Sequence, residues 1–162
     1  MEPIQINSPA HLALQISQQM NDHGWAMLGL EFEGLLYHFT VGLEYNYGHP
    51  NLEVFGLEDA YGKSLLTVLV SYIQSGRKLT NGDFFSELVN GYDLLLVENP
   101  QNPEGPPITG GRLRLVWPDV NHKFPWDEGC DPRCHAQKSI PPATGIDLEH
   151  IHLIFEAQNE LA

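Results

Sequence analysis

The chain has 162 residues, of which 42% are hydrophobic and only 18% are charged, so we expect one folded domain with its own core rather than a disordered acidic segment. The formal net charge of −13 argues against direct binding to nucleic acid, because neutralising phosphates requires clustered Lys and Arg. The sequence has neither an apolar run of roughly 18 residues, which a membrane span requires, nor the basic and apolar start of a signal peptide. We therefore expect a cytoplasmic protein that does not enter a membrane.

The charge is unevenly distributed along the chain. Residues 1–62 contain eight acidic residues and no Lys or Arg, and all eight Lys and Arg residues come later. This distribution is typical of a soluble acidic surface, but it also fits a negative face that attracts a basic partner or a cation. Both interpretations stay open at the level of the sequence.

The first predicted element is a helix over residues 9–22. Ser8 is a favoured N-cap, Pro9 suits the first helical position, and Gly24 suits the position just after the end. An apolar stripe recurs at helical spacing, formed by Leu12, Ala13, Ile16 and Met20. We expect this stripe to pack against the core.

Three strands are predicted next. Residues 25–32 and 35–43 are rich in apolar residues and are separated by the short polar break Glu33-Gly34, which predicts a hairpin. A shorter strand is expected over residues 52–56, after the break at Gly48-His49-Pro50.

The remaining sequence predicts one more helix and three more strands. The helix covers residues 60–74, with a buried face formed by Leu65, Leu66, Leu69, Val70 and Ile73. Strands are expected over 92–98, 112–117 and 150–155. Four prolines make residues 99–111 a loop.

This order of elements predicts a single α+β domain with a mostly antiparallel sheet and two main helices packed against it. Strands outnumber helices, and turns connect most of them. We expect the two helices to cover one face of the sheet through Leu12, Ile16, Leu66, Leu69 and Ile73.

Two pairs of segments carry unusually specific residue choices. The first pair is Tyr37-His-Phe-Thr-Val-Gly-Leu43 and Gly48-His-Pro-Asn-Leu-Glu-Val-Phe-Gly-Leu57, and the second is Leu115-Val-Trp-Pro-Asp119 and Lys123-Phe-Pro-Trp-Asp127. With these motifs the chain resembles the family called domain of unknown function 4262, over about residues 24–129. The resemblance implies a small, mainly bacterial, cytosolic domain, and it brings no biochemical role with it. Residues 130–162 then form a C-terminal extension.

The chain departs from the pattern of this family in three places. Phe39 stands where the family usually has Tyr, Asn51 stands where it usually has Glu, and the loop over residues 99–111 is short. If the chemistry of the family used that carboxylate, Asn51 could not replace it as a base.

The first candidate binding residues belong to the second predicted strand and the turn after it. His38 and Thr40 occupy alternate positions and share one face, next to Gly42, where a backbone could approach a ligand closely. His49 lies in a constrained turn and could act as a general base or a ligand donor. The competing interpretation is structural for each of them: a satisfied core histidine for His38, and a turn residue bonded to a carbonyl for His49.

The second group of candidates is aromatic and acidic. Trp117 and Trp126 could sandwich a planar ring while Asp119 accepts its polar hydrogens, with Asp127 nearby. Alternatively, these residues form a rigid aromatic loop in which each Asp caps a turn. We predict that His49 and Asp119, the two catalytic candidates, lie within about 10 Å of each other in one concave site.

A metal site is a further hypothesis. Cys130, Cys134 and His135 provide three donors within six residues, which is compatible with zinc. Free thiols are the alternative, and a structural disulfide is disfavoured in a reducing cytosol.

Two functions remain in competition. In one, the domain binds a small planar ligand, with or without catalysis, in a pocket of His, Thr, Asp and Trp side chains. In the other, it is an acidic interaction module, such as an inhibitor or immunity-like protein, that binds a basic partner protein. The sequence does not indicate a particular cofactor or an oligomeric state.

Overall fold

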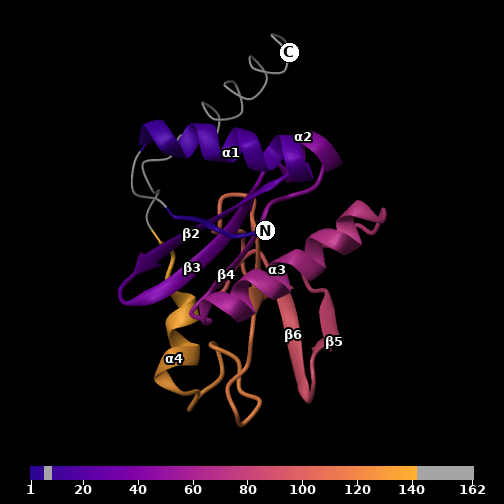
Figure 1. The fold of residues 1–162 in the computed structure, drawn as a ribbon. Coiled ribbons are helices and arrows are strands. Elements are labelled where there is room, and N and C mark those ends of the chain that lie inside the picture. The colour runs from indigo at the N-terminus through magenta and orange to yellow at the C-terminus, as the bar shows by residue number, and fades with distance from the viewer. Residues whose placement is uncertain (6–8, 142–162) are drawn as a thin grey trace.

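The computed structural model describes residues 1–5 and 9–141, which form a single α+β domain. Its seven-stranded sheet has the order β1-β2-β3-β4-β7-β6-β5, and Figure 1 shows the helices arranged around it. The neighbours are antiparallel except for the pairs β1–β2 and β4–β7. The strands are β1 (Ile4–Gln5), β2 (Ala26–Phe32), β3 (Leu35–Val41), β4 (Leu52–Phe55), β5 (Phe84–Val89), β6 (Tyr92–Val97) and β7 (Leu113–Val116). The predicted fold class is confirmed.

Local sequence signals account for the N-terminal half. Helix α1 (Pro9–His23) and the β2–β3 hairpin lie where the sequence predicts them. Glu33 and Gly34 both have positive φ, as a two-residue turn between strands requires. Strand β3 ends at Val41, two residues earlier than predicted, because Gly42 adopts a φ of 92° and begins the short helix α2 (Leu43–Tyr47).

The two main helices cover opposite faces of the sheet, so the expectation that they share one face is wrong. Helix α3 (Asp59–Gln74) packs in the same cluster as Met27, whereas α1 packs with the neighbouring residues Ala26 and Leu28. Successive side chains of a strand point to opposite faces. An apolar stripe shows that a helix is buried, but it does not show against which face.

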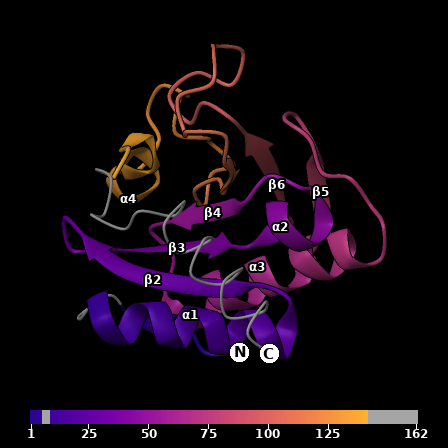
Figure 2. The same ribbon diagram turned by 90° about the horizontal axis from the view of Figure 1, so that it is seen from above.

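The C-terminal part of the described chain continues the layer opposite α3. It comprises helix α4 (Pro132–His135) and a 3₁₀ turn (Ala136–Lys138). Both views show α1 and α4 well apart from each other (Figures 1 and 2). Phe124 and Trp126 pack here against three apolar residues of β6 and β7, namely Leu95, Val97 and Val116.

Five elements within the described residues have no counterpart in the predictions: β1, α2, β5, α4 and the 3₁₀ turn. Strand β5 pairs with β6 through an irregular register, and its exposed and buried residues do not alternate strictly. The predicted strand over residues 150–155 lies outside the described residues. None of the helices within the described ranges is both long and apolar enough to cross a membrane.

Candidate functional site

A groove runs between the N-terminal half of α3 and the segment that follows β7. It consists of two hollows, of about 440 Å³ and about 320 Å³. The hollows share six lining residues, which are Leu57, Tyr61, Trp117, Pro118, Asp119 and Val120. We call the whole the α3 groove. The larger hollow extends toward the β5–β6 hairpin through Val89, Tyr92 and Leu94, and the smaller one toward α4 through Asp131 and Arg133.

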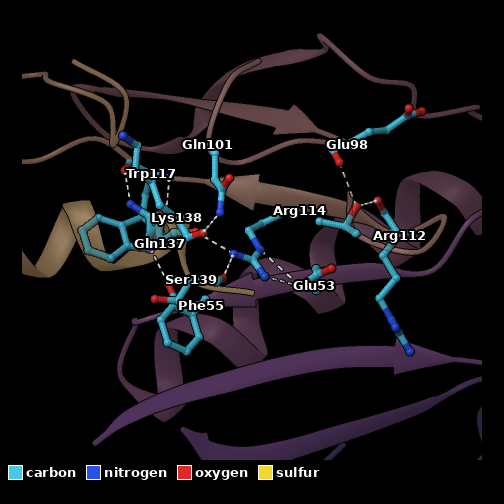
Figure 3. Close-up of polar contacts among 11 residues, drawn as sticks. Glu53, Phe55, Glu98, Gln101, Arg112, Arg114, Trp117, Gln137, Lys138 and Ser139 are labelled. Carbon is cyan, nitrogen blue, oxygen red and sulfur yellow. Dashed lines mark hydrogen bonds and ion pairs between the residues drawn. The ribbon is translucent and has the colours of Figure 1, made fainter. Parts of the chain in front are cut away.

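Trp117 is held rigidly at the centre of this groove. Its indole Nε1–H donates to the carbonyl oxygen of Phe55 at 2.9 Å. The side-chain amide of Gln137 accepts from the Trp117 N–H at 3.0 Å and donates to the Trp117 carbonyl at 2.7 Å, as Figure 3 shows. Gln137 is fully buried. The Gln137 amide therefore satisfies the backbone N–H and carbonyl of Trp117, as a neighbouring strand would do inside a sheet.

A buried ion pair in turn holds the segment that carries Gln137 (Figure 3). Arg114 on β7 lies beside Glu53 on β4 and donates to it through Nη2 at 2.8 Å and Nε at 3.1 Å. Arg114 Nη1 donates to the carbonyl oxygens of Gln137 at 2.6 Å and Ser139 at 2.7 Å. Both charged side chains are almost completely buried. This network fixes the C-terminal segment to the sheet and thereby fixes Trp117.

The phenol of Tyr37 is a further hydrogen-bond partner of the Glu53 carboxylate. Burial, reinforced by the negative charge of Glu53, raises the pKa of the Tyr37 phenol far above its ordinary value. The phenol therefore stays protonated and bonds to the Glu53 carboxylate. The sequence does contain a sign of this network, because Glu53 and Arg114 are the only charged residues within the two short apolar strands β4 and β7.

Asp119 organises the loop at the edge of the groove. Its Oδ1 accepts backbone N–H groups of Asn121 at 2.8 Å and Lys123 at 3.0 Å, and its Oδ2 accepts that of Asp131 at 3.0 Å. These bonds, that of Lys123 above all, lower the pKa of the Asp119 carboxyl. A carboxylate held in this way is a fixed negative charge rather than a general base tuned to neutral pH.

The walls of the groove are mainly aromatic and apolar. Tyr61 on α3 is 63% exposed, and Val120 beside Asp119 is 74% exposed. Tyr92 at the start of β6 forms part of the larger hollow and stacks on His122. The sequence predictions missed Tyr61, Val120 and Tyr92. The sequence offered one signal for Tyr61: this aromatic residue lies outside the apolar stripe of α3, so its ring does not face the core.

The structure places the first group of predicted residues away from the groove. Both ring nitrogens of His49 are satisfied, because Nδ1 bonds to the Pro50 carbonyl at 2.8 Å and Nε2 accepts the Leu79 N–H at 2.9 Å. His49 is buried and lines neither hollow. His49 therefore shares neither hollow with Asp119, and the alternative of a turn histidine bonded to a carbonyl describes its geometry.

His38 and Thr40 do share one strand face, as predicted, but this face lies under α3. His38 Nε2 bonds to Asp59 Oδ1 at 2.9 Å, and Thr40 bonds to the side chain of Asn51 at 3.1 Å. Both are buried. Gly42 serves packing, because a Cβ there would lie 2.5 Å from the methyl carbon of Met20. These three residues act as parts of the core.

The two predicted indoles do not face each other. Trp117 belongs to the α3 side of the sheet, whereas Trp126 stacks on Phe124 at 5.3 Å and packs on the opposite side. The Asp127 carboxylate caps a turn by accepting the Phe124 N–H at 2.8 Å. The expected sandwich of a ring between two tryptophans is therefore not formed, while Trp117 and Asp119 do lie together in the groove.

The proposed zinc ligands do not converge. Cys134 is buried on α4, and its thiol donates to carbonyl oxygens of Trp117 and Lys123 at 3.4 Å, whereas the neighbouring His135 is exposed. Burial raises the pKa of the Cys134 thiol to about 12. Within residues 1–5 and 9–141, no three His, Cys, Asp or Glu side chains lie close enough to hold a metal ion. Cys130 and Cys134 are both free thiols.

Comparison with known proteins identifies the family. Searches of curated proteins and of solved structures find no match. The family model described as "Domain of unknown function (DUF4262)" matches residues 19–131, a span that includes the predicted region of resemblance and every groove residue up to Asp131. Since this match covers more than half of the chain, the protein belongs to the DUF4262 family.

Proposed function

We propose that the domain binds a small planar ligand in the α3 groove. The observation that carries the proposal is the larger hollow of about 440 Å³, whose walls include the aromatic rings of Tyr61, Tyr92 and Trp117. This volume lies within the ~300–1,000 Å³ typical of ligand pockets, which are mostly apolar with a few polar groups that orient the ligand. Asp119 would be that polar group.

The rigidity of Trp117 supports a binding role. Its ring, its N–H and its carbonyl are all held by Phe55 and Gln137, so little conformational entropy remains to be lost when a ring packs against it. Planar ligands gain most from such a preorganised aromatic surface, because offset or edge-to-face contacts require a defined ring geometry.

The chemistry of Asp119 favours binding over proton transfer. A carboxylate whose pKa is lowered by three backbone N–H groups accepts hydrogen bonds well but is a weak base at neutral pH. We therefore propose a binding module, with Asp119 as the acceptor for polar hydrogens of the ligand.

Indole N–H signals in nuclear magnetic resonance can test this proposal directly. The chain has three tryptophans, so ¹⁵N labelling yields three reporters. Trp117 lines the groove, whereas Trp25 is buried in the core and Trp126 packs on the opposite side of the sheet. In a screen of planar aromatic fragments, binding should shift the Trp117 signal and leave the other two unchanged.

A pair of matched variants locates the binding. Tyr61→Ala removes a groove residue that is 63% exposed, and Phe84→Ala removes an equally exposed aromatic, at 62%, that lines neither hollow. Tyr61→Ala should weaken fragment binding several-fold, and Phe84→Ala should not. If no fragment moves the Trp117 signal, or if both variants behave alike, the groove is not a ligand site.

A second function is favoured by the exposure of the groove rim. Tyr61 and Val120 present apolar surface to solvent on an acidic protein, which suits a basic protein partner with an apolar anchor residue. Under this alternative, short Arg- or Lys-flanked aromatic peptides would bind with higher affinity than isolated rings. Calorimetry that compares the affinity of such peptides with that of isolated rings would separate the two proposals. Tyr61→Ala would show whether the peptides bind at the groove.

A further inference from the structure

The charge of the groove narrows the class of ligand that it can take. In the larger hollow, Asp119 is the only charged residue among the lining side chains that the structure describes, and three aromatic rings surround the same space. The smaller hollow adds the carboxylates of Glu58 and Asp131 and one guanidinium, that of Arg133. The groove is therefore both aromatic and predominantly negative.

Asp119 retains capacity to bind a further donor. Two backbone N–H groups use Oδ1 and only one uses Oδ2, while a carboxylate can accept about four hydrogen bonds in all. These backbone donors carry no full positive charge, so the Asp119 carboxylate still attracts an organic cation that lies beside Oδ2, whether or not that cation donates an N–H.

Arg133 does not cancel this preference in the larger hollow. Its Nε donates to the Gly56 carbonyl at 3.0 Å, which holds it at the α4 end of the groove, and it does not line the larger hollow. Lys123, whose charge also lowers the pKa of Asp119, lines neither hollow and donates to the Glu128 carbonyl at 3.1 Å. A ligand cation in the larger hollow would therefore meet aromatic faces and the Asp119 carboxylate. Tyr and Trp faces attract cations through the ring quadrupole.

We infer that the α3 groove selects a planar organic cation: an aromatic ring system that carries a positive charge. This inference rests on the proposed function and adds the sign of the charge to it. Neutral rings would occupy the same place through apolar contact alone, and anionic rings would be repelled by Asp119, Glu58 and Asp131.

Three probes that share one ring system test the sign. N-methylquinolinium is a cation, quinoline is uncharged at neutral pH, and quinoline-4-carboxylate is an anion. Titrations followed by the Trp117 indole signal should show the cation binding about tenfold more tightly than quinoline, with the anion weakest. Added salt should weaken only the cation, since screening acts on the charge term.

Two variants of one exposed residue isolate the charge from the shape. Val120 lines both hollows and is 74% exposed, so replacing it does not threaten the fold. Val120→Lys should weaken N-methylquinolinium binding about threefold relative to Val120→Gln, whereas quinoline should not distinguish the two variants. The unchanged spectrum of Trp25 and Trp126 confirms that each variant is folded.

The possible outcomes distinguish the preference for a cation from the proposal that the groove binds a ligand at all. If quinoline binds as tightly as N-methylquinolinium, or if the anion binds best, the preference for a cation is refuted while the groove stands as a ligand site. If none of the three probes shifts Trp117, both the preference and the proposed function fail.

Discussion

Replacing Arg114 by Met tests the buried ion pair that holds the groove together. The Arg114 side chain is fully buried, and its guanidinium makes four hydrogen bonds: two to Glu53 and one each to the carbonyl oxygens of Gln137 and Ser139. Met has nearly the same length but cannot donate. Arg114→Met therefore leaves one carboxylate and two carbonyls without these donors, in a site closed to water.

The expected loss of stability is large. Breaking a buried pair by removing one partner costs about 3–5 kcal/mol, because the other charge is left uncompensated. The two carbonyls add to this, at about 1–3 kcal/mol for each one left unsatisfied, although such terms are not additive. We therefore expect the free energy of unfolding to fall by at least about 4 kcal/mol, out of the ~5–15 kcal/mol typical of a domain. The midpoint of thermal unfolding should fall by roughly 8–16 °C.

Urea unfolding followed by tryptophan fluorescence measures this change. Arg77→Met is the matched control, because Arg77 is an exposed arginine whose guanidinium lies over the rings of Tyr72 at 5.1 Å and Phe85 at 5.2 Å. The cost of Arg77→Met should stay below about 1 kcal/mol. The double variant Glu53→Met with Arg114→Met should be more stable than Arg114→Met alone, because it removes the unpaired carboxylate.

Two results would refute this reasoning. A cost for Arg114→Met no larger than for Arg77→Met would mean that the pair contributes little. If the double variant loses as much free energy of unfolding as the two single variants lose together, Glu53 and Arg114 are not coupled. Trypsin provides an independent check, since cleavage after Lys138 should be faster in Arg114→Met if the guanidinium holds this segment to the sheet.

Three further results are expected. Cys134 should react with iodoacetamide far more slowly than Cys130 at neutral pH, because burial raises the pKa of its thiol to about 12; equal labelling by mass spectrometry would contradict this. Gly62→Ala should destabilise the protein by about 1 kcal/mol in urea unfolding, although Ala favours helices, because its Cβ would lie 2.6 Å from Nδ1 of His38; a stabilised variant would disprove the contact. The pKa of Asp119 lies below its ordinary 3.8, so its stabilising effect is complete above that pH and is lost as pH falls through the lower, folded-state pKa; amides bonded to it should then exchange faster, and constant protection down to acid unfolding would refute the assignment.

Much of the local structure follows from the sequence because its causes are local. The Ser8-Pro9 start and apolar stripe predict α1, the Glu33-Gly34 break predicts the β2–β3 hairpin, and the leucine-rich stripe predicts α3. In each case the period of apolar residues and the turn chemistry act over a few positions, and tertiary packing does not oppose them.

The candidate site depends on the order of the strands, which no local pattern contains. Glu53 and Arg114 are 61 residues apart, and they meet only because β4 and β7 are parallel neighbours. The same arrangement brings Trp117 to Phe55 and places Tyr61 and Tyr92 on the walls of one groove.

His49 and Trp117 show that a sequence motif does not predict whether a side chain is buried or accessible. Both belong to motifs whose unusual residues predict a function. His49, however, bonds to two backbone groups and is buried, whereas the Trp117 ring lines the groove. The sequence determined which side chains are aromatic or polar. The tertiary structure decided which of them meet solvent, because burial depends on what packs against a residue from distant parts of the chain.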